Sequence, residues 1–190
     1  MILLFFSGSL FAVDRRAPDI VVYGAKFTDT SLGAILFDQD TSYRNSYLYV
    51  GALNLPLDSR VGPFRFETEG QVGAHFGLMK HMEFNGLLIA RWDAPYVPLS
   101  FGLGEGLSLA SSKPRLEIEW DNFLHLRMTQ DTSPLLNYLM MEMDMAVPGL
   151  DFAKNPRVFM RIHHRSGAFG TYCQPTCGSN FIAYGLKVAL

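Results

Sequence analysis

The chain has 190 residues and a formal net charge of −2, with 48% hydrophobic and 18% charged residues. This length fits one domain, and the near-neutral charge argues against nucleic-acid binding, because a phosphate-binding surface normally carries an excess of Lys and Arg. The sequence lacks the run of about 18 apolar residues that a membrane helix requires, so a membrane protein of this composition would have to be a β-barrel.

The first segment, residues 2–12, is apolar and includes several small residues. It is typical of a secretory signal peptide, although the positively charged start of such a peptide is missing. We therefore predict a signal-peptide remnant over residues 1–12 and a single barrel domain over residues 13–190. A buried first strand or a hydrophobic tail remains the alternative for this segment.

Alternation of apolar and polar side chains recurs through the chain, and no long segment shows the 3.6-residue period of a helix. Successive side chains of a strand point to opposite faces, so each alternating run predicts a strand with one apolar face. The predicted strands, in chain order, are 19–29, 46–57, 64–76, 82–93, 97–110, 135–147, 157–167 and 180–190.

The connections between these strands differ in length. Short connections with Pro, Gly or Asp turn signals are 58–63, 94–96 and 148–156, and the longer ones are 31–45, 111–134 and 168–179. Short turns at one end and longer loops at the other are typical of outer-membrane barrels, whose termini share the periplasmic side when the strand number is even. The connection 77–81 is short where this scheme expects a long loop. We predict an all-β fold, an antiparallel eight-stranded transmembrane β-barrel.

Charges decide which face points inward. One face of the strands carries acidic and basic side chains of mixed sign, which suit pairing across a narrow lumen, while the opposite face is rich in Phe, Met, Leu and Val. The charged face is therefore predicted to line the lumen and the apolar face to contact lipid. Residues predicted inward include Arg65, Glu67, Glu69, Glu142 and Arg161, and we expect Glu142 to pair with Arg161 on the next strand.

The run 97–110 places small residues on the inward face, where large neighbours need room: Gly102, Gly104, Gly106 and Ser108. Glu105 conflicts with this assignment, because the same register places it on the apolar face. Either a local bulge turns Glu105 inward, or its side chain sits at the membrane interface.

Other side chains are consistent with a membrane barrel but do not indicate a catalytic or metal site. The residues predicted to form aromatic belts are Tyr47, Tyr49, Trp92, Tyr96 and Trp120. The residues Met141, Met143 and Met145 are predicted to face lipid or to form a packing surface, and not to bind a metal. In a soluble barrel, the same aromatic residues would instead form the core or the rim.

The cysteines are Cys173 and Cys177, separated by three residues in a loop. Zinc sites normally use three or four protein ligands, so this pair makes a poor metal site. We expect a small loop disulfide, which requires an oxidising compartment.

The run 157–167 is the most informative for function. His164 and Ser166 share its apolar face, whereas His163 lies on the charged face and is expected to be an inward partner of Glu142 or Asp144. His164 and Ser166 then project outward near the outer leaflet, about 6–7 Å apart along the strand. A serine needs an adjacent base, itself oriented by a third group, to act as a nucleophile.

At these residues the chain resembles the PagL-type lipid A 3-O-deacylase family, eight-stranded outer-membrane barrels with a Ser-His-Glu triad exposed to lipid. The sharpest match is His164-Arg165-Ser166 near the end of the penultimate strand, and the stretches 101–108, 136–138 and 178–180 also look like members described this way. The resemblance implies an outer-membrane location and lipid A or lipopolysaccharide as the partner. It implies no cofactor and no metal.

The chain departs from the family pattern at two positions. Where the family has its acid, at the start of the final strand, this chain has Asn180, whose carbonyl can orient an imidazole but carries no charge. Where the family has Asn directly after the serine, this chain has Gly167, so the backbone N–H groups of Gly167 and Ala168 are the candidate oxyanion donors.

Three functions are therefore compatible with the sequence. The leading prediction is a lipid A esterase with Ser166 as nucleophile, His164 as base and Asn180 as the residue that orients it. The second is a non-catalytic structural barrel of the OmpX type, and the third is a soluble lipocalin-like binder with an apolar lumen. The missing acid favours the second, and the charged alternation disfavours the third.

Overall fold

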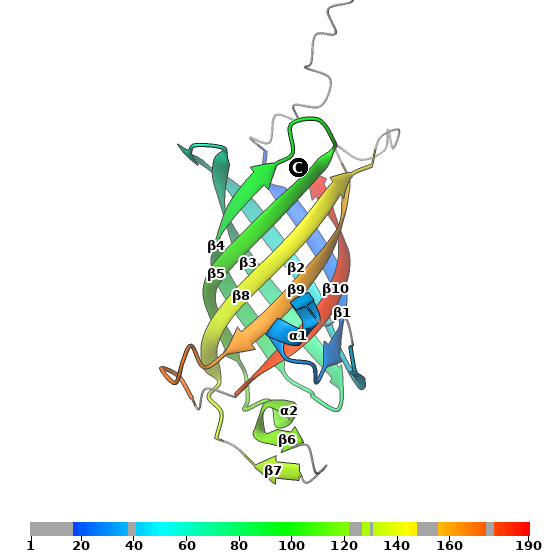
Figure 1. The fold of residues 1–190 in the computed structure, drawn as a ribbon, viewed down its shortest axis with the longest axis vertical. Helices are drawn as coiled ribbons and strands as arrows, with labels where there is room; N and C mark the ends of the chain where they lie inside the picture. Colours follow the sequence, from blue (N-terminus) through cyan, green and yellow to red (C-terminus); the bar gives the residue numbers. More distant parts are fainter. Residues whose placement is uncertain (1–16, 38–40, 122–126, 130, 148–155, 174–176) are drawn as a thin grey trace, which may run out of the picture.

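The computed structural model describes residues 17–37, 41–121, 127–129, 131–147, 156–173 and 177–190, so the predicted signal-peptide remnant at 1–12 lies outside the described residues. Eight strands form a closed barrel (Figure 1), in which every neighbouring pair is antiparallel. In order around the barrel they are β1 (Asp19–Thr28), β10 (Gly178–Ala189), β9 (Arg157–Ser166), β8 (Leu135–Ala146), β5 (Leu99–Ala110), β4 (Met82–Asp93), β3 (Phe64–Gly77) and β2 (Tyr43–Val61).

The barrel confirms the predicted fold class and each of the expected strands. β2 is longer than predicted, and its pairing with β3 shifts register between Pro56 and Arg60, where the alternation is interrupted. Proline has no N–H to donate to the ladder, so such a shift is a common way to accommodate it. The connections contain further elements that the alternation did not predict: α1 (Leu32–Phe37), α2 (Arg115–Ile118), β6 (Glu119–Asp121) and β7 (Arg127–Thr129).

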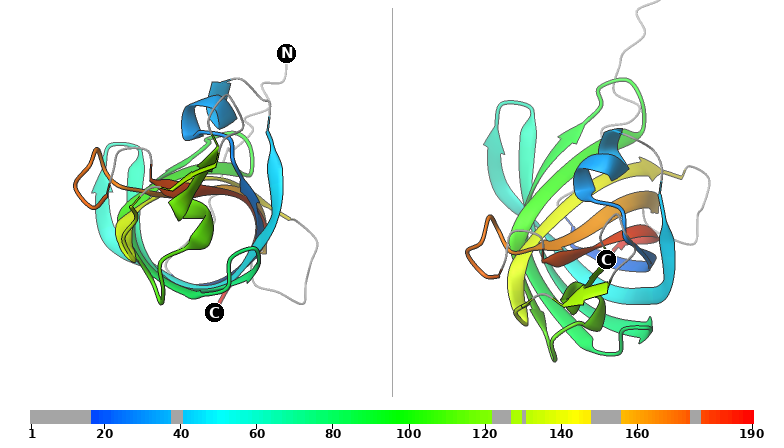
Figure 2. Two further views of the ribbon diagram at one scale, coloured as in Figure 1. Left: turned by 90° about the horizontal axis from the view of Figure 1, so that it is seen from below. Right: turned by 60° about the horizontal axis from the view of Figure 1, so that its bottom comes forward.

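The start of β1 and the end of β10 lie at the same end of the barrel, where Asp19 pairs with Ala189. The opposite end, called the loop end below, carries α1, α2 and the β6–β7 hairpin (Figure 1). Seen along the barrel axis, α2 lies across this opening (Figure 2). The side chains of Leu116 and Glu117 are buried there, so α2 packs into the loop end of the lumen and covers part of it.

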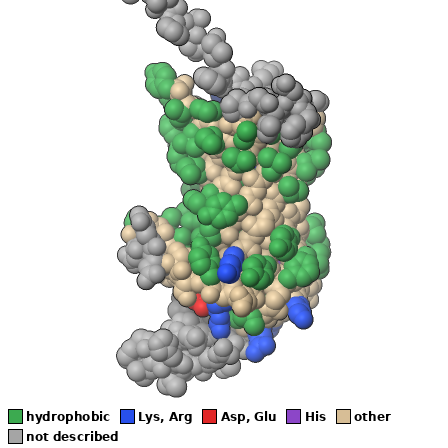
Figure 3. Space-filling view, turned by 90° about the vertical axis from the view of Figure 1, so that its right-hand side faces the viewer, with side chains coloured by type: hydrophobic (Ala, Val, Ile, Leu, Met, Phe, Trp, Pro, Cys, Tyr) green, Lys and Arg blue, Asp and Glu red, His purple; other side chains and the backbone are tan. Residues whose placement is uncertain are grey.

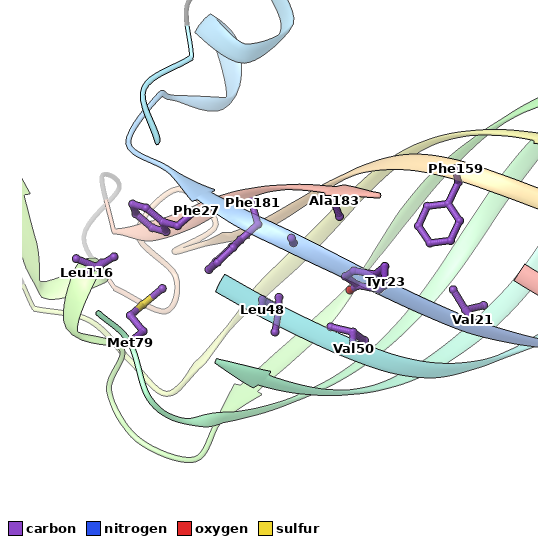
Figure 4. Packing of buried hydrophobic residues seen from close by; sticks show 11 residues of the cluster. Val21, Tyr23, Phe27, Leu48, Val50, Met79, Leu116, Phe159, Phe181 and Ala183 are labelled. Carbon is purple, nitrogen blue, oxygen red and sulfur yellow. The ribbon is translucent and has the colours of Figure 1, made fainter. Parts of the chain in front are cut away.

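Polar and charged side chains fill much of the lumen, as predicted. Arg161 on β9 donates to Glu142 on the neighbouring β8 (2.6 Å) and to Glu69 on β3 across the barrel (2.7 Å), which confirms the expected Glu142–Arg161 pair. The predicted inward residues Arg65 and Glu67 are buried as well. A cluster of buried apolar side chains from β1, β2, β9 and β10 adjoins this network and extends to Met79 and Leu116 at the loop end (Figure 4).

The outer wall is apolar. In Figure 3 hydrophobic side chains cover much of the described wall, and the basic side chains in this view lie in its lower half. Met143, Met145, Tyr47 and Tyr49 are exposed on the outside of their strands. Trp92 stacks against Phe101 at the end opposite to the loops, Tyr96 is exposed, and the side chain of Trp120 lies outside the described residues. No helix in the described part of the chain is long and apolar enough to cross a membrane.

The inward glycines of β5 leave room for large neighbours, as predicted. A Cβ atom at Gly104 would lie 2.8 Å from a methyl group of Leu87 and 3.0 Å from Ile89. A Cβ atom at Gly102 would lie 3.2 Å from the guanidinium of Arg91. The lumen side of β5 is thus a surface onto which the side chains of β4 pack.

Candidate functional site

His164, Ser166 and Asn180 meet on the outer wall near the loop end. His164 and Ser166 are the last two outward residues of β9, and Asn180 on β10 is the direct register partner of His164. All three side chains are half-buried. The structure therefore pairs His164 with Asn180 and places Ser166 on the same outward face, two residues further along β9.

A hydrogen-bond chain fixes the orientation of His164. The side-chain Nδ2 of Asn180 donates to the carbonyl oxygen of Thr30, at a distance of 2.9 Å, in the connection after β1. The Oδ1 of Asn180 therefore faces Nδ1 of His164, 2.6 Å away. Because an amide oxygen can only accept, Nδ1 of His164 must carry the proton, and Nε2 keeps its lone pair. A serine hydroxyl needs this tautomer if the imidazole is to act as its base.

Ser166 lies on the same face as His164, two residues further along β9. Its hydroxyl makes no hydrogen bond to His164, although both residues are described by the structure. Catalytic hydrogen bonds are often long before substrate binds and shorten in the complex, so this geometry is compatible with a nucleophile and base. The imidazole of His164 is thus oriented by Asn180, whereas Ser166 is not hydrogen-bonded to it.

The segment after β9 offers the predicted oxyanion donors. Gly167 is buried and Ala168 is half-buried, and among the described residues neither N–H donates a hydrogen bond. Ala168 and Phe169 have φ angles of 45° and 56°, which are uncommon and cost energy for residues with a Cβ. The turn is held by hydrogen bonds from Gly170 and Tyr172 to the carbonyl of Gly167.

The disulfide between Cys173 and Cys177, which the sequence predicted, closes the connection from β9 to β10. This connection projects sideways from the barrel wall (Figure 1). Phe169 is fully exposed within it. The disulfide thus restrains a loop that begins directly after the candidate nucleophile.

A second polar pair on the outer wall was not anticipated. β5 continues without a bulge and Glu105 is exposed, so it points outward, and of the two predicted orientations the inward one is wrong. Asn137 on β8 donates to Glu105 at 3.2 Å and is the direct register partner of Ser166. An ionisable side chain on a lipid-facing surface is costly and marks a candidate functional site. In the sequence, a charged residue on an apolar face, Glu105, was the sign of a polar site here. Its partner Asn137 could be identified only once the strand register was known.

The predicted partner of His163 is wrong. His163 points inward, as expected, but its Nε2 bonds Glu83 at 2.8 Å, and its Nδ1 lies 2.9 Å from the Tyr23 hydroxyl and 3.0 Å from the Tyr138 hydroxyl. The register sets Met140 opposite His163 on β8, so the ring reaches across the lumen to β4. His163 therefore belongs to the lumen network and not to the outer site.

Near the loop end of the lumen, His75, His81 and Glu83 are close enough to hold a metal ion. Burial, together with the neighbouring His75, lowers the pKa of His81 to about 3. Burial also raises the pKa of Glu117 in α2 above its usual value, although Arg165, which donates to it at 2.6 Å, opposes this shift. None of these groups lies on the outer wall with Ser166, so the outer site uses no metal from this cluster.

Comparison with known proteins defines the fold. No protein-family model matches the chain, and no curated protein matches it. Among solved structures, the chain is similar to the crystal structure of the outer membrane enzyme PagL, with a TM-score of 0.53 and 13% sequence identity over 90% of this chain and 99% of that one. At this identity the likeness shows the fold alone, a closed eight-stranded barrel of the outer-membrane type.

Proposed function

We propose that the chain is an outer-membrane esterase that removes an ester-linked acyl chain from lipid A, with Ser166 as nucleophile and His164 as base. The single observation that carries this proposal is the hydrogen-bond chain from Thr30 through Asn180 to His164, which fixes the tautomer that serine activation requires. The apolar wall around these residues supports a lipid substrate. The choice of lipid A rests on the likeness of His164-Arg165-Ser166 to the deacylase motif and of the fold to an outer-membrane enzyme.

The proposed reaction has an acylation step and a deacylation step. The Ser166 hydroxyl attacks the ester carbonyl while Nε2 of His164 takes its proton, and a bond forms between Oγ and the acyl carbon. The C–O bond to the lipid hydroxyl then breaks, and His164 returns the proton to the leaving oxygen. Water, activated by the same imidazole, releases a fatty acid from the acyl-enzyme and restores Ser166.

Negative charge develops on the carbonyl oxygen during both steps. The N–H groups of Gly167 and Ala168, which donate no hydrogen bond within the described part of the chain, are the proposed donors to this oxygen. Asn180 orients the imidazole without charge, so it stabilises the imidazolium less than a carboxylate would. We therefore expect slower turnover than a complete Ser-His-acid triad supports.

The direct test is mass spectrometry of lipid A from cells that express the protein and from cells that do not. Loss of one ester-linked acyl chain is expected with the unmodified protein. Ser166→Ala should abolish this loss, because removing a nucleophile lowers the rate by about 10⁶ in a well-studied serine protease. Ser59→Ala, an exposed serine near the opposite end of the barrel, is the matched control and should retain full activity.

A non-catalytic structural barrel is the second candidate. Two observations favour it: the Ser166 hydroxyl makes no hydrogen bond to His164, and an amide stands where an acid would complete the triad. This candidate becomes the better one if folded protein leaves lipid A acylation unchanged, or if Ser166→Ala is as active as its parent.

A further inference from the structure

A band of polar side chains crosses the outer wall near the loop end and extends beyond the three residues of the outer site. His164 on β9 pairs with Asn180 on β10, on one side of the strand. On the other side, Ser166 pairs with Asn137 on β8. Asn137 in turn donates to Glu105 on β5 at 3.2 Å. The band therefore continues from the proposed nucleophile across two further strands of a mostly apolar wall.

The carboxylate of Glu105 is exposed among apolar neighbours. The next outward residues on β5 and the residue opposite on β4 are exposed leucines: Leu103, Leu107 and Leu88. Among the described residues no Lys or Arg forms an ion pair with Glu105, and its hydrogen bond there comes from Asn137. Ionisable groups on a lipid-facing wall are costly and usually serve a function, so binding is the role to consider for this carboxylate.

Asn137 is oriented by hydrogen bonds from its amide nitrogen, as Asn180 is on the other side of β9. Its Nδ2 donates to Oε1 of Glu105 at 3.2 Å and to the carbonyl oxygen of Gly106 at 3.5 Å, so the donor end of the amide is directed at β5. The oxygen at the other corner, Oδ1, accepts no hydrogen bond within the described part of the chain, and neither does Oε2 of Glu105. The Glu105–Asn137 pair thus offers two acceptors to a ligand and no free side-chain donor.

These acceptors lie beside the proposed nucleophile. Directly opposite residues of antiparallel strands have Cβ atoms about 4.5–5.5 Å apart, so Asn137 is the immediate neighbour of Ser166. Glu105 lies one strand further, about 10 Å from Ser166 measured across the strands. Along β9, away from the loops, the outward residues Met160 and Val158 are apolar and exposed, which suits an acyl chain. The polar band across the strands is then the place for the head group.

We propose that Asn137 and Glu105 form a subsite that binds hydrogen-bond donors, hydroxyl or amide N–H groups, on the sugar head group of the substrate. This inference rests on the proposed esterase function and names the part of the substrate that the wall recognises. A carboxylate accepts charge-assisted hydrogen bonds, which are roughly twice as strong as neutral ones. It also repels phosphate, so the subsite favours a lipid whose acyl chains are esterified to a sugar over a glycerophospholipid.

The first test compares two ester substrates of the full-length barrel in the same mixed micelles: lipid A, whose sugars carry donors, and p-nitrophenyl palmitate, which has none. The measured quantity is kcat/KM for lipid A divided by kcat/KM for p-nitrophenyl palmitate. Glu105→Gln keeps an acceptor for Asn137 and removes the charge, so it should lower this ratio by about tenfold or more. Asp58→Asn, which neutralises an exposed carboxylate near the opposite end of the barrel, is the matched control and should retain the parent ratio.

Binding is measured separately in the Ser166→Ala background, which prevents turnover, by equilibrium titration with fluorescently labelled lipid A. Adding Glu105→Gln to this background should weaken binding by about tenfold. An inactive parent refutes the esterase function, and the binding measurement then decides the subsite by itself. Equal binding with and without Glu105→Gln overturns the subsite, as does an unchanged ratio of the two kcat/KM values.

A further variant, Glu105→Leu, separates binding from a structural role. Because it removes a charge from the lipid-facing wall, it should leave the urea midpoint of unfolding in vesicles unchanged or raise it. Folding of each variant is checked by circular dichroism and by its heat-dependent migration in gels. A lower midpoint for Glu105→Leu would show that the Glu105–Asn137 pair holds β5 and β8 together, and it would overturn the proposal.

Discussion

At the scale of single residues, the outer site depends on the two unlike ends of an amide. Asn180 donates through Nδ2 to Thr30 and accepts through Oδ1 from His164, so the position of the donor decides the tautomer of the imidazole. An aspartate at this position could accept from His164 and would add charge, but it could not donate to the carbonyl of Thr30. The orientation of the His164 imidazole and the charge beside it are thus separate contributions to catalysis, and substitutions at Asn180 can distinguish them.

We predict that Asn180→Ala lowers kcat by about 10–100-fold with little change in KM, because it removes orientation of the base in a site that already lacks the charge of an acid. Asn180→Asp should retain more activity than Asn180→Ala, since the acceptor for Nδ1 of His164 is kept. Steady-state assays on lipid A in mixed micelles measure both constants. A kcat for Asn180→Ala equal to that of the parent would show that Asn180 does not orient His164.

The outward positions of His164, Ser166 and Asn180 could be predicted because strand alternation determines the face and the strand ends determine the register. Thr30 could not be predicted, since it comes from a connection 150 residues before Asn180 in the sequence. The contact between Asn137 and Glu105 was missed for the same reason, because it depends on which strands become neighbours. The direction of a side chain follows from the local sequence, whereas its hydrogen-bond partners on other parts of the barrel follow only from the complete fold.

At the scale of elements, β5 shows why small residues recur on one face of a strand. A Cβ atom at Gly106 would lie 2.0 Å from the carbonyl oxygen of Gly86 on β4, and that oxygen belongs to the backbone and cannot rotate away. Gly70 on β3 has no neighbouring atom within 4 Å of the corresponding position. The sequence predicted the stripe of small residues, but only the register distinguishes a required glycine from a replaceable one.

Gly106→Ala should therefore lower the free energy of unfolding by about 1–3 kcal/mol, the usual cost of overpacking. Gly70→Ala, the matched control, should be neutral or slightly stabilising, because alanine restricts the unfolded chain. Urea titrations of the two variants in lipid vesicles measure this difference. Equal effects of the two substitutions would mean that β4 and β5 separate at Gly106 at little cost.

The sequence did not predict the short helix α2. It spans Arg115–Ile118, about one helical turn, which is too short for an apolar period to be visible. Its position is determined by tertiary contacts: Leu116 joins the buried apolar cluster, and Glu117 bonds Arg165 and Ser179. Closure of the loop end therefore depends on side chains that look like ordinary loop residues in the sequence.

The raised pKa of Glu117, caused by its burial, makes the stability of this closure depend on pH. In the folded protein Glu117 holds its proton more tightly than in the unfolded chain, so its contribution is complete below about pH 4.5 and is lost as the pH rises through the raised value. We predict that the parent loses stability relative to Glu117→Gln between about pH 4 and pH 7. Unfolding midpoints of both proteins at the two pH values test this; a constant difference would refute it.

At the scale of the whole molecule, polar groups that cross the lumen join opposite walls of the barrel. Alternation predicted that charged side chains point inward, and adjacent strands gave the Glu142–Arg161 pair, but the contact of Arg161 with Glu69 spans from β9 to β3. Such a contact depends on closure of the sheet. The lumen network therefore forms only in the complete, closed barrel and not in any single pair of neighbouring strands.

Arg161→Met should lower the free energy of unfolding by about 3–5 kcal/mol, because it leaves Glu69 buried without its cationic partner, whereas Glu142 keeps Arg91 and Lys187. Adding Glu69→Gln to Arg161→Met should restore part of this loss, since the double variant removes the uncompensated charge and retains the cavity change. Arg60→Met, at an exposed position, is the control and should have little effect. Urea titrations in vesicles measure all three variants. If the double variant is no more stable than Arg161→Met alone, the loss comes from packing, and the ion pair across the lumen does not hold the two walls together.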